Sequence, residues 1–171
     1  MSAAPLGPMP TDRLVRTVDE LVVHAPLARI FELAADVERW PTHLSHYRYV
    51  RFLDAADDGA RVVEMSANRP FGLVDWPTWW TSRMSVVSPG PSARPAVRFT
   101  HVAGVTKGME VEWTFETDRN GTLVRIVHVW NGPAWPLIGE TTAKHVIAPV
   151  FVHGIASRTL AGLAQVAERS T

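Results

Sequence analysis

Histidine, serine and tyrosine side chains occur where they could perform acid–base chemistry. His128 and His101 each occupy a segment in which apolar and polar residues alternate, and Ser82 occupies another. Because a histidine titrates near neutral pH, either imidazole could take a proton from a carbon beside carbonyl groups and return one to a departing hydroxyl group. Tyr47 and Ser82 could orient carbonyl oxygens through hydrogen bonds. We take His128 as the first hypothesis for the base.

The alternation of side chains along a strand decides which of these residues share a face. In 107–117 the apolar residues occupy the odd positions and glutamates lie between them, so Trp113 faces inward. In each of three other strands we expect an arginine to face water, so the residues on either side of it face inward. The inner face therefore includes Trp76, Trp80, Ser82, Met84, Val97, Phe99, His101, His128 and Trp130.

Three polar side chains on this inner face indicate a cavity that holds water. A buried polar group without a partner costs about 1–3 kcal/mol, so several in a dry core would be expensive. Each histidine could be satisfied separately by the backbone or by a place at a strand end, and that alternative stays open. The tryptophans suit a pocket wall, because an indole offers flat apolar contact and one N–H donor. Trp113 could instead be ordinary core.

One strand and two short helices begin the predicted fold. The first strand covers 13–23, and Pro26 opens a helix because its fixed φ suits a first-turn position. Asp36 could cap a second short helix that stops near Trp40-Pro41, since residues before a proline avoid the helical conformation. We expect 1–12 to be a flexible tail and 13–171 to form a single ligand-binding domain.

Six strands and a long helix complete the chain. The Asn120-Gly121 pair suits a tight hairpin turn, and so does Asp57-Asp58-Gly59. A long helix covers 136–169, with a bend where Pro149 removes a hydrogen bond. The strands are predicted at 47–53, 61–67, 76–87, 96–102, 107–117 and 123–130. This order predicts an α+β helix-grip fold, in which a curved seven-stranded antiparallel sheet wraps around the C-terminal helix.

Composition excludes several classes of function. The 171 residues carry 17 basic and 17 acidic side chains, which removes the electrostatic case for nucleic acid or an anionic membrane. There is no cysteine, so disulfides and thiolate chemistry are excluded. The chain shows no signal peptide and no apolar run long enough to span a membrane, so we expect a cytoplasmic protein.

The sequence also lacks the marks of a cofactor or metal site. It has no phosphate-binding glycine loop, no nucleophile elbow and no dinucleotide fingerprint. His43 and His46 could place two ligands on one helical face, but no carboxylate accompanies them. We therefore expect neither a cofactor nor a metal.

The chain resembles the START-related, Bet v 1-like superfamily, and within it the polyketide aromatase/cyclases and their bacterial relatives. The likeness extends from Val18 to about Glu168 and rests on the element order and on three local matches. These are the segment from Pro26 to Trp40-Pro41, Tyr47 with the Trp80-Thr-Ser82 strand, and the closing Ser157-Arg-Thr-Leu-Ala-Gly-Leu. The resemblance implies a cavity in which a poly-β-keto chain undergoes aldol closure and dehydration, lined by Trp40, Tyr47, Trp80 and Ser82.

The sequence departs from the cyclase pattern at one position. Those enzymes often carry an arginine two residues beyond the serine, where this chain has Met84. That change removes the obvious positive charge for a developing enolate. It favours the second hypothesis, a non-catalytic carrier or sensor of a lipid, quinone or similar molecule. A third alternative is an interaction module whose cavity is vestigial.

Twelve residues are the candidates for the site. His128, His101, Tyr47 and Ser82 form the catalytic set, and the partner is a hydrophobic small molecule. An acyl carrier protein would be a further partner of the enzyme, and pairing with a second copy of the chain stays open. The ligand-binding candidates are Trp40, Trp76, Trp80, Met84, Phe99, Trp113, Trp130 and His145.

Overall fold

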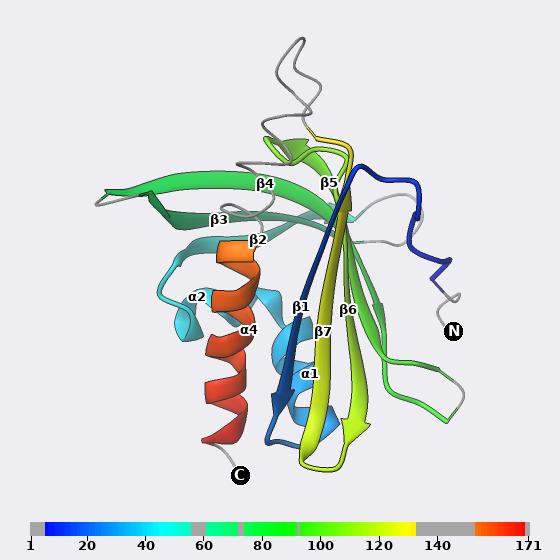
Figure 1. Cartoon of the computed structure of the whole chain (residues 1–171). Coiled ribbons are helices and arrows are strands. Elements are labelled where there is room, and N and C mark those ends of the chain that lie inside the picture. Colours follow the sequence, from blue (N-terminus) through cyan, green and yellow to red (C-terminus); the bar gives the residue numbers. More distant parts are fainter. Residues whose placement is uncertain (1–5, 56–60, 72–73, 92, 133–152, 170–171) are drawn as a thin grey trace.

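A curved antiparallel sheet enclosing one long helix makes up the computed structural model (Figure 1). The structure describes residues 6–55, 61–71, 74–91, 93–132 and 153–169, without the side chains of 54–55, 69–71 and 74–76. Its elements are β1 (Val15–Val23), α1 (Leu27–Ala35), the 3-10 helix η1 (Val37–Arg39), α2 (Trp40–His43), β2 (Tyr47–Ala55), β3 (Arg61–Phe71), β4 (Val74–Val87), β5 (Ala96–Gly104), β6 (Glu110–Asp118), β7 (Gly121–Trp130) and α4 (His153–Glu168).

The seven strands follow one another in space in the order β1-β7-β6-β5-β4-β3-β2, and all pairs are antiparallel. Figure 1 shows β1, β7 and β6 standing side by side while β4, β3 and β2 curve across the end of α4. The short helices lie in the same hollow as α4. The predicted α+β helix-grip architecture is confirmed. No helix in the described ranges is long and apolar enough to cross a membrane.

The prediction for the second short helix is wrong at its end. A helical turn begins at Trp40 and includes Pro41 in its first turn, where the missing N–H would have had no partner. The Asp36 side chain makes no capping hydrogen bond. The indole N–H of Trp40 instead donates to the carbonyl oxygen of Leu33 at 2.9 Å, which fixes the tryptophan against α1.

The Asn120-Gly121 hairpin joins β6 to β7 as predicted. Asp118 pairs with Gly121, whose φ of 144° is a conformation that glycine adopts without strain. A Cβ at Gly121 would also overlap the carbonyl oxygen of Val23. The predicted turn at 57–59 and the bend at Pro149 lie outside the described residues.

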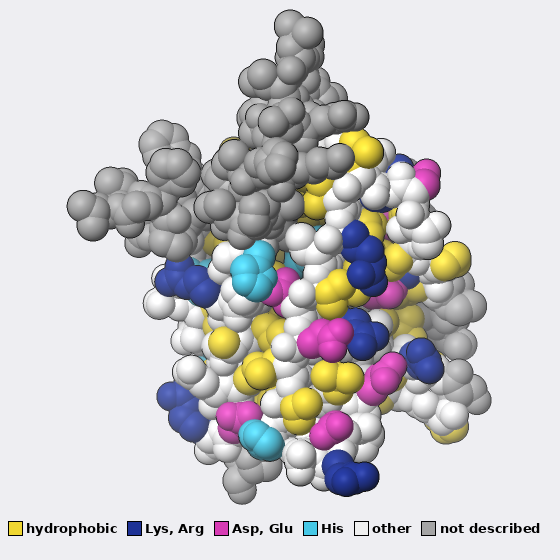
Figure 2. All heavy atoms as spheres, viewed as in Figure 1, with side chains coloured by type: hydrophobic (Ala, Val, Ile, Leu, Met, Phe, Trp, Pro, Cys, Tyr) yellow, Lys and Arg dark blue, Asp and Glu magenta, His cyan; other side chains and the backbone are white. Residues whose placement is uncertain are grey.

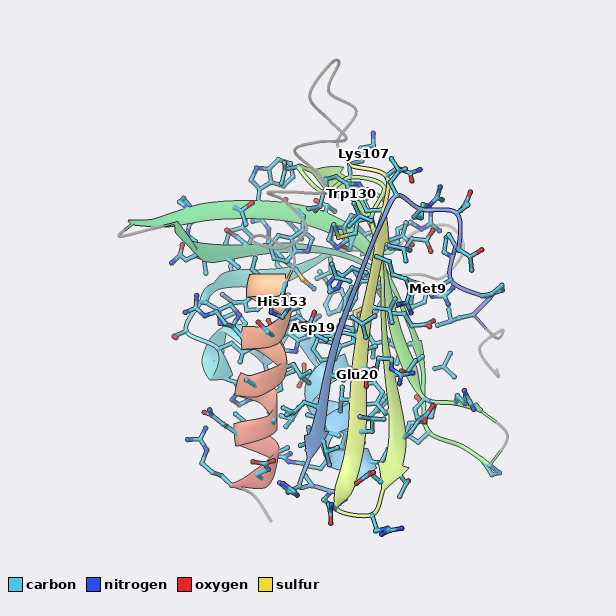
Figure 3. The ribbon with its side chains drawn as sticks, viewed as in Figure 1. Met9, Asp19, Glu20, Lys107, Trp130 and His153 are labelled. Atoms are coloured by element: carbon cyan, nitrogen blue, oxygen red, sulfur yellow. The ribbon has the colours of Figure 1, made fainter. Side chains whose placement is uncertain are left out.

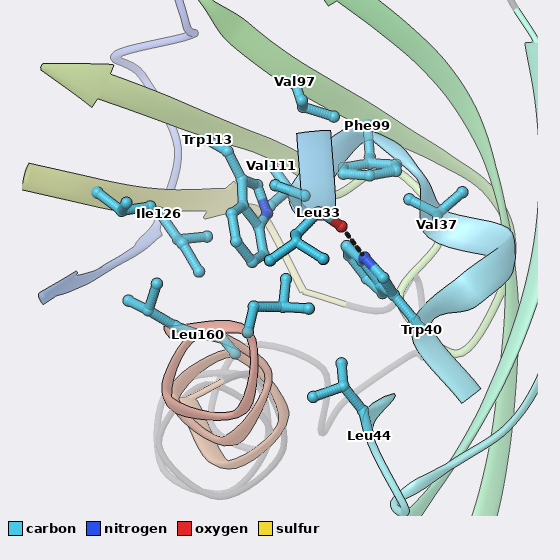
Figure 4. Packing of buried hydrophobic residues seen from close by; sticks show 14 of the residues in the cluster. Leu33, Val37, Trp40, Leu44, Val97, Phe99, Val111, Trp113, Ile126 and Leu160 are labelled. Carbon is cyan, nitrogen blue, oxygen red and sulfur yellow. Dashed lines mark hydrogen bonds between the residues drawn. The ribbon is translucent and has the colours of Figure 1, made fainter. Parts of the chain in front are cut away.

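The core lies between the sheet and the helices. Figure 4 shows Leu33, Trp40, Trp113, Ile126 and Leu160 converging from different elements. The described part of α4 buries Ala156, Thr159, Leu160, Leu163, Ala164 and Ala167, which recur at the spacing of one helical face. The ring of Phe31 on α1 meets that of Phe115 on β6 edge to face, with centroids 5.3 Å apart.

A glycine sets the distance between β5 and β4 where the pairing shifts register. Trp80 pairs with Gly104, but Ser82 pairs with His101, so β5 contains one residue more than β4 over this interval. Gly104 has a φ of 93°, and a Cβ there would lie 2.6 Å from the carbonyl oxygen of Trp79. The close approach holds Trp80 beside the end of β5.

We expect the substitution Gly104→Ala to lower the free energy of unfolding by more than about 2 kcal/mol, because backbone strain and overlap act together. Gly90→Ala is the control, since nothing lies within 4 Å of a Cβ at Gly90. Urea unfolding followed by tryptophan fluorescence measures both. Equal midpoints for the two variants would contradict this account of the register shift.

Candidate functional site

A cavity between the concave face of the sheet and α4 is the candidate site. Its water-accessible volume is about 70 Å³, which leaves room for water. Strand, turn and helix residues all contribute to its wall. They are Trp40, Tyr47, Met65, Trp80, Phe99, His101, Thr106, Met109, Val111, Trp113, Ile126, His128, Ile155, Ala156 and Thr159.

Aromatic rings in contact form one side of the cavity. The Trp40 ring lies 5.2 Å from that of Tyr47 and 5.8 Å from that of Trp113. Tyr47 in turn lies 6.3 Å from Trp80, which stacks on His101 at 6.1 Å. These centroid distances fall in the range of favourable aromatic pairs. Each ring therefore restrains its neighbours and keeps a flat apolar wall toward the cavity.

His101 is held at the cavity by its own hairpin. Its Nδ1 lies 2.7 Å from the hydroxyl oxygen of Thr106, a hydrogen bond within the turn between β5 and β6. The backbone closes the same turn, because the amide of Gly108 donates to the carbonyl oxygen of His101 at 2.8 Å. The ring is thus oriented by its turn partner and by its stacking on Trp80.

His128 is a buried neutral imidazole. Its exposed fraction is 8%, and burial lowers its pKa to about 3, with a further lowering from the charge of His153. Its Nδ1 lies 3.3 Å from the hydroxyl oxygen of Thr17, directly across the β1–β7 ladder. At neutral pH the ring therefore carries one proton and one lone pair, and a base requires such a lone pair.

A second buried histidine, which sequence reasoning treated only as a metal candidate, lies beside the cavity. His46 is 7% exposed, whereas His43 points to solvent. The His46 Nε2 lies 3.1 Å from the hydroxyl oxygen of Thr159, and that hydroxyl lies 3.3 Å from the Tyr47 hydroxyl. Burial, and secondarily the charge of Arg158, lower the pKa of His46 to about 4.

The structure brings seven of the twelve candidate residues to the cavity and leaves three elsewhere in the core. Those at the cavity are Trp40, Tyr47, Trp80, Phe99, Trp113, His101 and His128. Ser82, Met84 and Trp130 are buried but are not among the lining residues. The side chain of Trp76, and all of His145, lie outside the described residues.

Ser82 and Trp130 depart from expectation for different reasons. Ser82 lies between Val63 and His101 on neighbouring strands, and its side chain is too short to project beyond theirs. Its buried hydroxyl has no hydrogen-bond partner in the described part of the chain. The Trp130 indole N–H donates to the carbonyl oxygen of Lys107 at 2.9 Å, so this ring closes the end of the sheet (Figure 3).

Several lining residues were missed, most of them because they lie outside the strands whose faces were assigned. Thr106 belongs to the turn after β5, where alternation gives no face. Ile155, Ala156 and Thr159 share one face of α4, and their spacing of one and four residues could have indicated it. Met65 follows the alternation of β3, which was not used for a face assignment.

A contact between the buried carboxylate of Asp19 and the exposed imidazole of His153 lies in a separate groove between β1 and α4 (Figure 3). The Oδ1 of Asp19 lies 2.6 Å from the Nδ1 of His153. Burial raises the pKa of Asp19, and His153 opposes that shift. Figure 2 shows hydrophobic and charged side chains together on this side of the molecule. The groove is lined by Val18, Asp19, Glu20, Leu21, His153, Ser157, Leu160 and Ala161. Within the described ranges, no three ligating side chains form a metal site.

With this geometry in view, comparison with known proteins gives the family. Residues 23–145 match the family described as polyketide cyclase / dehydrase and lipid transport. The chain belongs to this family. Among polyketide cyclase relatives, a putative polyketide cyclase from Streptomyces halstedii is 29% identical over 110 residues, 64% of this chain and 94% of that protein.

Solved structures of the cyclase and START families share the fold. The Zhui aromatase/cyclase from Streptomyces sp. R1128 has a TM-score of 0.67 at 19% identity, covering 91% of this chain and 94% of its own. A START superfamily protein from Mycobacterium smegmatis has a TM-score of 0.64 at 12% identity, covering 91% and 99%. The resemblance predicted from the sequence is confirmed.

The two buried histidines predict how stability depends on pH. Their folded-state pKa values, about 3 for His128 and about 4 for His46, lie below the ordinary value of 6.5. Between these limits the unfolded chain binds more protons, so acid lowers the free energy of unfolding, by up to about 1.4 kcal/mol per pH unit for each histidine. Above about pH 7 the slope fades, because the unfolded chain then binds few protons at these residues too.

We expect His128→Gln to remove one of these two contributions. The difference in unfolding free energy between wild type and variant should change by about 1.4 kcal/mol per pH unit from pH 6 to 4.5. It should stay constant above pH 7. Urea unfolding across this range measures the difference, and a constant difference down to pH 4.5 would mean that His128 is not neutral in the folded protein.

Proposed function

We propose that this member of the polyketide cyclase family binds a poly-β-keto or aromatic precursor in the cavity and promotes aldol closure and dehydration. The observation that carries the proposal is the neutral imidazole of His128, buried at an aromatic-walled cavity. A base that removes a proton from carbon must be unprotonated and within reach of the ligand. In this proposal an acyl carrier protein delivers the chain.

The proposed reaction returns every proton that His128 takes. With Nδ1–H directed to Thr17, the Nε2 atom removes a proton from a methylene carbon between two carbonyl groups. The enolate carbon attacks another carbonyl carbon of the same chain, which forms the C–C bond, and the new alkoxide takes the proton back. His128 then removes a second ring proton and donates it to the departing hydroxyl group, so that water leaves and a double bond forms.

Tyr47 and His101 would orient the carbonyl oxygens. Both side chains line the cavity beside Trp80 and stack or pack against it. A hydrogen bond from Tyr47 to the carbonyl oxygen would stabilise the enolate as charge develops on that oxygen. The folded ligand needs more space than about 70 Å³, so we expect Met65 and Met109 to shift, because methionine changes rotamer readily.

A second candidate function is binding or transport of a hydrophobic small molecule without reaction. The observation that favours it is the charge of the wall: no lysine or arginine is among the described residues that line the cavity. An enolate would therefore depend on neutral hydrogen-bond donors, whereas a lipid or quinone requires only apolar contact. The family description includes lipid transport as well as cyclase activity.

We expect His128→Gln to lower the rate of ring closure by about 10²–10⁴-fold, the usual contribution of a general base. The assay follows a poly-β-keto thioester by mass spectrometry for loss of water. His43→Gln is the matched control, because His43 is exposed, and it should keep wild-type activity.

Two results would contradict the cyclase proposal. Unchanged rate and product distribution in His128→Gln would remove this residue from the mechanism. If the wild-type protein binds the thioester saturably but never accelerates its closure, the transport alternative replaces the enzyme.

A further inference from the structure

Three buried polar side chains, two of them consecutive in the sequence and the third on α4, meet at one edge of the cavity. His46 precedes β2, Tyr47 is the first residue of β2, and Thr159 lies on the buried face of α4. The Thr159 hydroxyl lies 3.1 Å from His46 Nε2, 3.3 Å from the Tyr47 hydroxyl and 2.8 Å from the carbonyl oxygen of Ile155. Thr159 and Tyr47 both line the cavity, while His46 does not.

The single hydrogen of the Thr159 hydroxyl determines which of the three partners donate to it. A threonine hydroxyl has one hydrogen and can accept two. The Ile155 carbonyl can only accept, and it is the nearest of the three partners. When Thr159 donates to it, His46 must donate from Nε2–H and Tyr47 from its O–H, which uses both acceptor sites of Thr159.

A ligand oxygen beside Tyr47 changes this arrangement without moving heavy atoms. Once the Tyr47 hydrogen turns to the ligand, the Tyr47 oxygen becomes an acceptor for Thr159. The Ile155 carbonyl retains the role of a backbone acceptor in α4, so Thr159 can turn its hydrogen to Tyr47. The donors then point one way, from His46 through Thr159 and Tyr47 to the ligand, and such chains strengthen each bond.

We propose that His46 and Thr159 are positioning residues that direct the hydrogen of Tyr47 to a carbonyl or enolate oxygen in the cavity. This inference rests on the proposed function, because the ligand oxygen belongs to the same site. It orients the donor that the proposed reaction uses to stabilise negative charge on the ligand oxygen.

The surroundings of His46 keep it a neutral donor. Its ring lies 4.8 Å from that of Tyr47, and the Tyr47 ring contacts Trp40 at 5.2 Å. The backbone of the same turn is fixed, because the amide of Asn68 donates to the His46 carbonyl oxygen at 2.7 Å. Arg158 is the charged neighbour that acts on His46, and it opposes protonation.

The test compares Thr159→Val, which removes the hydroxyl while keeping the shape, with Thr159→Ser, which retains it. Tyr47 and Tyr49 are the two tyrosines of the chain, so a Tyr49→Phe background isolates the ionisation of Tyr47. In the ligand-free protein, ultraviolet titration should show the Tyr47 ionisation constant reduced roughly tenfold in Thr159→Val, because its phenolate loses a donor. Thr159→Ser should titrate like the parent.

Acetylacetone is the probe for the loaded site, because its enol absorbs in the ultraviolet. We expect its dissociation constant to rise about tenfold in Thr159→Val and in Tyr47→Phe, and to stay unchanged in Thr159→Ser. A second pair of variants tests the proposal if Thr159→Val folds poorly. His46→Leu removes the donor at Nε2, and His46→Gln restores an N–H near that position. The leucine variant should weaken binding and the glutamine variant should recover it.

The proposal would be overturned if Thr159→Val matched Thr159→Ser in Tyr47 titration and in acetylacetone affinity, and if His46→Leu matched His46→Gln in affinity. Its failure is distinct from failure of the cyclase function, because Tyr47 ionisation is measured without turnover. If the titration pattern holds but no ring closes, the positioning role survives and the cyclase reaction does not.

Discussion

The site depends on a difference in side-chain size across one contact. Broad aromatic rings of the sheet and of α2 face a part of α4 that carries small side chains. Further along α4, the side chains of Leu160 and Leu163 are buried in the core. Beside the cavity α4 carries Ala156 and Thr159, and the Thr159 hydroxyl lies 3.3 Å from the hydroxyl of Tyr47 on the opposing wall. Larger residues at these two helix positions would project into the space, so the cavity depends on side-chain size on α4 as well as on the sheet.

Burial at the cavity determines the protonation states of the histidines of the site. Burial makes the charged form of an imidazole expensive, and it leaves His128 and His46 neutral over the physiological range. Neutral donors contribute less to an anion than a guanidinium would, but they avoid the desolvation cost of a buried charge. In the described wall, polar function is therefore supplied by hydroxyl and imidazole groups, each oriented by a specific partner such as Thr17 or Thr106.

The sequence predicts the sheet and much of its inner face, because alternation over seven or more residues assigns faces independently of packing. That argument correctly directs Phe99, Trp113 and His128 inward. Alternation does not show how far each inward side chain projects into the cavity. Ser82 was therefore expected at the cavity, although the longer side chains beside it project further. Thr159 was missed because its function depends on contacts with residues more than a hundred positions away.

The enclosure of His128 also indicates which reactions the site can support. A buried base suits a reaction in which each proton taken from the ligand is returned to the ligand, because no exchange with water is then needed. Aldol closure with dehydration satisfies this condition, since its only proton acceptors are an alkoxide and a departing hydroxyl. The low pKa of His128 is compatible with this proposed role. An enolate formed beside the ring would supply the opposite charge that raises the pKa. In the proposed mechanism the ligand itself would therefore raise the basicity of the imidazole that acts on it.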